Sequence, residues 1–305
     1  MSVINIDGMS FFVSGRLIKI GAIKDEYWLE TDQLNEPEQV IEHIKKNRNK
    51  IDIFTFTQKP LDAEPRYSYY MEWDNVAALP IETFEHWWTK QVNDKTRNMT
   101  RKAQKKGVEV RIVPFDNTLV EGIAGIYNET PVRQGRPFWH YGKDIEEIRK
   151  ENSTFLERSD FLGAYCNEEL IGFIKLVYVG RVAGMMQILS KIKDRDKAPN
   201  NALVAKAVEV CADKGIKYLT YARFVYGKKE IDPLAEFKRH NGFQRINIPK
   251  YYIPLTLKGT IGLRFRLHQD FDEFLPQNLI LYLRDIRAKW YKKKLESTHA
   301  ELKRV

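Results

Sequence analysis

Cysteine is scarce in this chain. Its 305 residues include two cysteines, Cys166 and Cys211, which lie in apolar segments without CxxC spacing. The six histidines are scattered, without the paired spacing that a structural metal site requires. We therefore expect neither a disulfide framework nor a structural metal, and a chain of this length buries enough apolar surface to fold without them.

Long apolar runs are also missing. No stretch reaches the roughly 18 apolar residues that a membrane-spanning helix needs. The first ten residues, MSVINIDGMS, lack the basic region and apolar run of a secretory signal. Internal repeats and low-complexity segments are not found. We expect a cytoplasmic protein in a reducing compartment, with no membrane span.

The composition of the chain is that of a globular protein, with an excess of positively charged residues. Hydrophobic residues make up 43%, charged residues 30% and aromatic residues 12%, which is typical of a folded soluble protein. The length favours about two domains. The net charge of +9 favours an acidic partner, such as a nucleic acid, a phosphate-bearing cofactor or an anionic glycan or membrane surface. A generally basic surface is the alternative.

Hydrophobic periodicity predicts an α/β protein. In the first part, a helix over Glu36–Lys46 lies among short strands, and a long helix from about Glu82 to Lys106 ends at Gly107. The strands predicted in this part are Phe11–Val13, Leu17–Ile20, Ile51–Phe56, Tyr67–Trp73 and Val108–Val113.

The second part has a more regular pattern. Helices over Thr118–Tyr127 and Asp144–Asn152 precede a β-meander. The strands are Phe161–Cys166, Leu170–Val179, Val182–Leu189, Tyr218–Phe224 and Phe243–Leu255, and the later helices are Asn200–Lys214, Pro233–His240 and the C-terminal Leu275–Leu302. From Phe161 the order is β-β-β-α-β-α-β.

Local motifs give this order a family likeness. LGAY at 162–165 followed by ELIGF at 169–173, and FKRHNGF at 237–243, are similar to the central hairpin and the late helix-to-strand junction of the GNAT acyltransferase domain. Upstream, KTRNMTRKAQKKGVEV at 95–110 is similar to a helix of the Fem-type aminoacyl transferases and related acetyltransferases. The chain therefore resembles the GNAT acyltransferase superfamily, and its pattern is closest to the Fem-type branch.

The resemblance implies an α/β fold with a GNAT-like mixed twisted sheet flanked by helices, plus a C-terminal helix. It also implies two GNAT-like lobes, the first degenerate, because Fem-type proteins pair two such halves. We expect a degenerate lobe over 1–115 that includes the basic helix 82–106, an acyltransferase domain over 116–260, and a basic helical extension over 261–305.

The resemblance further implies a donor site on the third strand of the meander. In a GNAT fold the acyl donor lies against this strand, here Met185–Ser190, and is bound by free backbone groups as at a sheet edge. Ile188, Leu189 and Ser190 are therefore candidate cofactor-binding residues. Backbone N–H groups near Leu189 are placed to hold the oxyanion.

The pyrophosphate of an acyl-CoA would lie where the next helix begins. Unpaired N–H groups there favour anions, which makes Asn200, Asn201 and Ala202 candidate cofactor-binding residues. The family's usual motif Q/R-x-x-G-x-G/A is absent, and residues 197–202 read KAPNNA. The expected donor is acetyl-CoA or another acyl-CoA, with aminoacyl-tRNA as the alternative.

A second group of candidate residues would catalyse the reaction or bind the acceptor. The resemblance makes Tyr226 the candidate acid, because it stands about where GNAT enzymes keep an acidic tyrosine; a packing role is the alternative. His140 is the candidate base that titrates near neutral pH, although a lone histidine is more often structural. The candidate acceptor-binding residues are Arg133, Gln134, Arg136, Trp139 and Tyr141, all in the loop PVRQGRPFWHYG at 131–142, together with Arg223.

The basic helix offers a candidate contact to nucleic acid. Arg97, Arg101 and Lys105 follow one another at helical spacing, with Lys102 and Lys106 on the adjoining row. Such a stripe suits a phosphate backbone. A solvated helix face explains it equally well.

The favoured function is that of an N-acyltransferase. It would transfer an acetyl or aminoacyl group to an amine of an amino sugar, a cell-wall precursor or a related small molecule. One alternative is a transferase that acts on a nucleic acid. Another is a non-catalytic, GNAT-like binding module.

Overall fold

The computed structural model describes residues 2–6, 9–24, 36–46, 51–58, 64–133, 136–225, 233–269 and 286. The strands are β1 (Ser2–Ile6), β2 (Met9–Ser14), β3 (Ile20–Ile23), β4 (Ile53–Thr57), β5 (Tyr70–Pro80), β6 (Glu109–Val113), β7 (Val132–Arg133), β8 (Arg136–Pro137), β9 (Ser159–Cys166), β10 (Glu169–Val179), β11 (Val182–Ser190), β12 (Tyr218–Thr220) and β13 (Gln244–Pro254). The helices are α1 (Pro37–Lys46), α2 (Phe84–His86), α3 (Asp94–Lys105), α4 (Asn117–Tyr127), α5 (Ile145–Asn152), α6 (Pro199–Asp213), α7 (Pro233–His240) and α8 (Leu257–Arg264).

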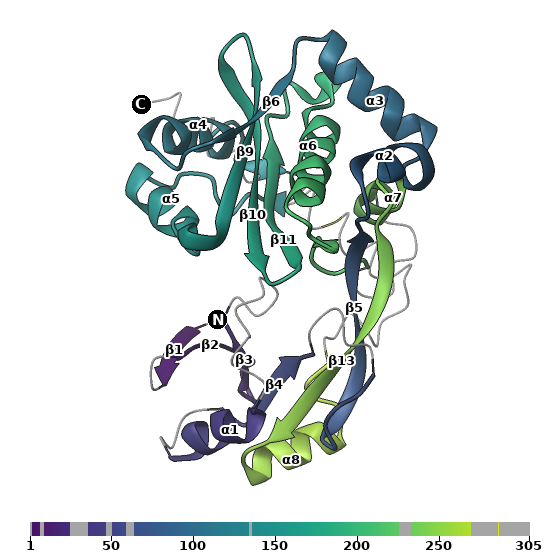
Figure 1. Ribbon diagram of the computed structural model, residues 1–305. Helices are drawn as coiled ribbons and strands as arrows, with labels where there is room; N and C mark the ends of the chain where they lie inside the picture. Colours follow the sequence, from purple (N-terminus) through teal and green to yellow (C-terminus); the bar gives the residue numbers. More distant parts are fainter. Residues whose placement is uncertain are drawn as a thin grey trace, which may run out of the picture.

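One continuous eleven-stranded sheet organises these elements. Its order is β1-β2-β3-β4-β13-β5-β12-β11-β10-β9-β6. Neighbouring strands are antiparallel except for β3–β4 and β11–β12, which are parallel. Helices flank the sheet (Figure 1). The predicted α/β class, with a mixed sheet flanked by helices, is confirmed.

The sheet repeats one topology twice. In each half, three consecutive antiparallel strands lead through a helix to a strand that is parallel to the third: β1-β2-β3-α1-β4 in the first half and β9-β10-β11-α6-β12 in the second. Each half also contributes a long strand that pairs with a strand of the other half. β13 lies between β4 and β5, and β5 lies between β13 and β12. The sheet therefore crosses the predicted boundary at residue 115 without a break.

Helices on opposite faces of the second half bury its two apolar surfaces. Leu203, Val204 and Val208 of α6 pack with the buried side chains of β9 and β10 on one face. On the other face, Ile123 and Ile126 of α4 belong to a separate buried cluster, shared with α5 and β10. Figure 1 shows α4 and α5 on one side of these strands and α6 on the other. A fully buried side chain of this size contributes about 1.5–3 kcal/mol.

The prediction of one long helix over 82–106 is wrong. α2 continues into a π-helical turn that ends at Val92, whose ψ of 140° is extended, and α3 begins anew after Asn93. The Thr96 N–H donates to Asn93 Oδ1 at 2.9 Å, so this asparagine caps a second helix. Gly107, with a φ of +74°, follows α3 where the predicted helix was expected to end.

Other predicted elements are present with shifted ends. β3 begins at Ile20, where the predicted strand ends; β5 extends to Pro80, and β12 stops at Thr220. The sequence pattern did not anticipate β1, the β7–β8 hairpin or α8. The predicted C-terminal helix lies outside the described residues, except for Ile286.

A fragment of residues 116–260 should not fold by itself. It keeps β12 and β13 but lacks β5, which lies between them, so both strands would expose unpaired edges. We expect no cooperative thermal transition by circular dichroism, whereas the full chain should unfold cooperatively. Cooperative unfolding of the fragment would contradict this interdependence and would support two independent domains.

Candidate functional site

The strand β11 has an open edge at its C-terminal end. It pairs with β12 only over Val182–Gly184, and within the described chain residues 185–190 have no strand partner on that side. On the other side the register with β10 shifts so that Met186 is left out of the ladder, which is a β-bulge. Three predicted donor-binding residues, Ile188, Leu189 and Ser190, lie on the open stretch. A bulge beside an unpaired edge presents backbone groups to a ligand.

The helix α6 begins earlier than the sequence indicates. Its first residue is Pro199, and Ala198 at the N-cap has a left-handed φ of 56° and no side-chain cap. Asn200, Asn201 and Ala202 therefore lie inside the first turn, and the expected opening at Asn200 is corrected by one residue. Proline suits this position because a first-turn N–H has no intrahelical partner.

A buried polar network lies beside the bulge, on the α4 and α5 face of the sheet. The half-buried Gln187 donates through Nε2 to Tyr127 Oη at 2.6 Å, and the same Nε2 lies 3.3 Å from His140 Nε2. His140 is 4% exposed and packs against the Tyr127 ring, with 4.1 Å between centroids. Its Nδ1 lies 3.6 Å from Glu151 Oε2. The network joins the acceptor loop to the donor strand.

Burial controls the ionisation of this network. Desolvation lowers the pKa of His140 to about 3, and the nearby charges of Lys143 and Arg133 act in the same direction. His140 is therefore neutral near pH 7, which differs from the expectation of a base that titrates there. Burial raises the pKa of Tyr127 to about 12, although its hydrogen bonds to Asn152 and Gln187 oppose this.

Arg133 holds the acceptor loop against the donor strand. Its guanidinium donates to the Ser190 carbonyl at 3.0 Å and to the Ile126 carbonyl at 2.9 Å. It also forms an ion pair with Glu129 at 3.3 Å and covers the Phe138 ring at 4.5 Å. The structure thus brings a predicted acceptor residue and a predicted donor residue together, through a bond within the protein.

The other predicted acceptor residues have different surroundings. Trp139 is 69% exposed, with the Lys143 ammonium 3.8 Å from its ring centroid. Tyr141 and Arg136 are exposed. Arg223 instead forms an ion pair with Asp74 of β5 at 2.7 Å. Gln134 and Tyr226 lie outside the described residues.

The basic helix is partly engaged within the protein. Arg97 donates to the Trp88 and Val92 carbonyls at 2.9 and 2.7 Å, and Arg101 lies 5.6 Å from the Trp88 ring centroid. The exposed members of the stripe are Arg101, Lys102, Lys105 and Lys106. These four side chains form an exposed basic surface at α3.

Sequence reasoning missed several polar residues of this region. Glu129 and Gln187 look like ordinary surface residues in the sequence, because their roles arise from contacts distant in the chain. Lys175 did carry a signal, as a lone lysine inside the apolar strand LIGFIKLV. It is 1% exposed, and it donates to the Asn152 carbonyl at 2.7 Å and to Thr154 Oγ1 at 3.1 Å.

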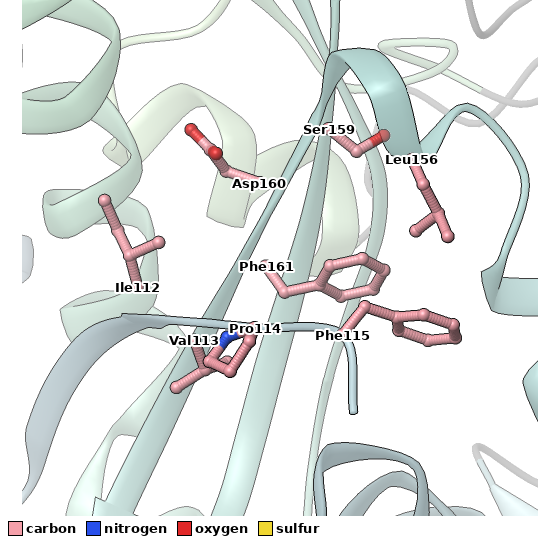
Figure 2. Close-up of a pocket in the computed structure, with 8 residues that line it drawn as sticks. All are labelled: Ile112, Val113, Pro114, Phe115, Leu156, Ser159, Asp160 and Phe161. Carbon is pink, nitrogen blue, oxygen red and sulfur yellow. The ribbon is translucent and has the colours of Figure 1, made fainter. Parts of the chain in front are cut away.

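A cavity of about 450 Å³ lies elsewhere, at the junction of β6 and β9. Figure 2 shows the residues that line it: Ile112, Val113, Pro114, Phe115, Leu156, Ser159, Asp160 and Phe161. The Asp160 carboxylate accepts from the Tyr178 hydroxyl at 2.8 Å and pairs with Lys214 at 3.1 Å. None of the predicted site residues lines this cavity.

Within the part of the chain that the structure describes, no group of three or more histidine, cysteine, aspartate or glutamate side chains is arranged to hold a metal ion. Among the same residues, no helix is both long and apolar enough to cross a membrane.

Comparisons with known proteins define the class of fold. No family model matches the sequence, and no curated protein matches it. Among solved structures, FemX matches with a TM-score of 0.53 at 11% identity, over 86% of this chain and 89% of that one. L-PGS from Bacillus licheniformis matches with a TM-score of 0.57 at 12% identity, over 85% of each chain. The C-terminal domain of a putative lysylphosphatidylglycerol synthetase from Agrobacterium fabrum matches with a TM-score of 0.57 at 10% identity, over 86% of each chain.

At these identities the likeness concerns the fold. The chain has a GNAT-like fold that extends over most of its length, and FemX is among the proteins that share it. The Fem-type branch is thus one of several groups with this architecture.

Replacing Arg133 by alanine should destabilise the protein. The change leaves Glu129 without its cation and removes the donors to two carbonyl groups, which we expect to cost about 2–4 kcal/mol. Arg136→Ala is the matched control, because the Arg136 side chain is exposed, and it should change the unfolding free energy by less than about 0.5 kcal/mol. Equal effects in urea unfolding would contradict the structural role of Arg133.

The His140 pKa predicts a pH dependence of stability. Because the folded value of about 3 lies below the unfolded value of about 6.5, the unfolded chain binds this proton more readily. The histidine therefore removes stability as the pH falls from 6.5 towards 3. Compared with His140→Gln, the wild type should lose unfolding free energy between pH 7 and 5. Parallel curves would contradict this, and His86→Gln on α2 serves as control.

Proposed function

We propose that the chain is an N-acyltransferase that transfers an acyl or aminoacyl group from an activated donor to an amine. The acceptor would be an amino sugar, a cell-wall precursor or a related small molecule. Support comes from the GNAT-like fold and from the arrangement of the donor strand beside the acceptor loop.

The observation that carries the proposal is the open edge of β11 over residues 185–190. The strand has a bulge at Met186, and the polar network of Gln187, Tyr127 and His140 lies next to it. An extended donor would add to this edge as a further strand does, through main-chain hydrogen bonds. Its carbonyl group would then lie within reach of an acceptor that enters along the loop 131–142.

The reaction forms one bond and breaks one. The amine nitrogen bonds to the carbonyl carbon of the donor, and the bond from that carbon to the leaving oxygen or sulfur breaks. One amine proton ends on the leaving group. Because His140 has a pKa of about 3, it accepts hydrogen bonds but does not deprotonate a free ammonium near pH 7. The acceptor amine therefore enters in its neutral form, with the half-buried Gln187 beside the bulge to orient it.

The exposed basic stripe supports a second candidate function. Arg101, Lys102, Lys105 and Lys106 lie on the surface of α3, where they would contact the phosphates of a nucleic acid. That nucleic acid would be either the acceptor itself or the tRNA of an aminoacyl donor. An affinity that falls steeply with salt, and that is reduced by removing these cations, would favour it over a purely small-molecule enzyme.

An amide-forming assay tests the proposal. Purified protein is offered acetyl-CoA or a set of aminoacyl-tRNAs, together with glucosamine and a lysine-containing peptidoglycan stem peptide, and the product is detected by mass. We expect amide formation with at least one pair. Gln187→Leu should lower kcat/KM at least tenfold, about 1.4 kcal/mol, because it removes the amide beside the bulge.

Gln244→Leu changes an exposed glutamine at the start of β13 and should leave the rate unaltered. A folded wild-type protein that forms no product with any of these donors would count against the enzyme and favour the non-catalytic binding module.

A further inference from the structure

The GNAT fold family implies an acyl-CoA donor whose pyrophosphate binds the loop between the donor strand and the next helix. In this chain that loop comprises residues 191–198, between β11 and α6. A pyrophosphate site needs backbone N–H groups or cationic side chains that are available to the anion. The donors and charges of this loop therefore show whether it fits the group.

The backbone N–H groups of the loop are largely satisfied by the protein itself. The Glu129 carboxylate, at the end of α4, accepts the N–H groups of Ile192 at 2.6 Å and Lys193 at 2.9 Å. Further along, consecutive 3-10 turns close the loop on its own carbonyls. These bonds are Arg195 N to Ile192 O at 3.1 Å, Lys197 N to Asp194 O at 3.0 Å, Ala198 N to Arg195 O at 3.1 Å and Asn201 N to Ala198 O at 3.1 Å.

The lysines of the loop are also paired within the protein. Lys191 and Lys193 both form ion pairs with Glu169, the latter at 3.1 Å. Lys197 pairs with Asp194 at 2.7 Å. Each ammonium is already partly neutralised by a carboxylate, which weakens its attraction for a phosphate. Arg195 is the exposed cation that remains.

Two carboxylates at this loop, Asp194 and Glu129, are largely buried beside the groups that a phosphate would need. Asp194 is 5% exposed, and its Oδ2 is buried without a hydrogen-bond partner within the described chain. The Glu129 side chain is 16% exposed and pairs with Arg133. A phosphate in this loop would face both negative charges in a partly desolvated setting, where like charges repel strongly.

We infer that Glu129 and Asp194 close the β11–α6 loop to pyrophosphate and so determine donor specificity. The residues of this loop do not fit the pyrophosphate of CoA. The Glu129 carboxylate accepts N–H groups of the loop that a phosphate would otherwise accept, and Asp194 forms an ion pair with Lys197. The inference rests on the proposed function in one respect, namely that the ligand of β11 is the acyl donor of a transferase. The donor then carries no pyrophosphate at this position.

Calorimetry with CoA and with inorganic pyrophosphate tests the inference. The wild-type chain should show no saturable binding of either probe up to about 1 mM, which corresponds to about −4 kcal/mol. Glu129→Gln combined with Asp194→Asn removes both charges with little change of shape, and should raise pyrophosphate affinity at least tenfold. Glu168→Gln, in the exposed β9–β10 turn, is the matched control and should bind no better than the wild type.

Several outcomes would overturn the inference. Wild-type binding of CoA with a Kd below about 100 μM would do so whatever the variants show. A double variant that is folded by circular dichroism and gains no pyrophosphate affinity would also do so. If the double variant fails to fold, the single substitutions Glu129→Gln and Asp194→Asn take its place, and at least one must show the gain.

The test separates this inference from the proposed function. If no donor is turned over and the wild type still fails to bind CoA, the proposed function fails and the closed loop stands. If acetyl-CoA is turned over, the closed loop is refuted and the transferase stands.

Discussion

The pairing of β5 with β13 is the constraint on which the rest of the structure depends. The two strands run antiparallel from Ala78 opposite Gln244 to Tyr70 opposite Tyr252, and each also pairs with a strand of the other half. This exchange merges two repeats of one topology into a single sheet. It also leaves the short β12 held between β5 and β11, so that β11 extends beyond its partner. The open edge at the candidate site lies where β11 runs beyond the three-residue β12.

Around that edge, polar side chains of the protein connect the acceptor loop to β11. Arg133 ties the acceptor loop to Ser190 at the end of β11, and Gln187 connects the bulge to Tyr127 and His140. Burial keeps His140 neutral, with a pKa of about 3. Near pH 7 these groups therefore interact through hydrogen bonds, with His140 in its neutral form. In the β11–α6 loop, likewise, carboxylates of the protein accept hydrogen bonds from backbone N–H groups and form ion pairs with the lysines. A bound phosphate would need the same groups.

The sequence predicted local elements far better than it predicted their pairing. The meander over 161–189 and the helix α6 follow from alternating and helical periodicity, since each signal lies within one segment. The break at Asn93 was missed because a capping asparagine looks like any polar residue of a helix. The positions of β5 and β13 depend on contacts more than 160 residues apart, which periodicity does not encode. For the site, the family resemblance indicated β11 and the loop 131–142, whereas Glu129 and Gln187 acquire their roles only through the tertiary fold.

Amide hydrogen exchange on β11 tests whether a donor adds to the open edge over residues 185–190, as proposed above. With an aminoacylated nucleoside analogue at saturating concentration, exchange in this stretch should slow by at least tenfold, because its main-chain groups enter hydrogen bonds with the ligand. Exchange in β4 should stay unchanged. Unaltered exchange over 185–190, with the analogue bound elsewhere on the chain, would contradict the account.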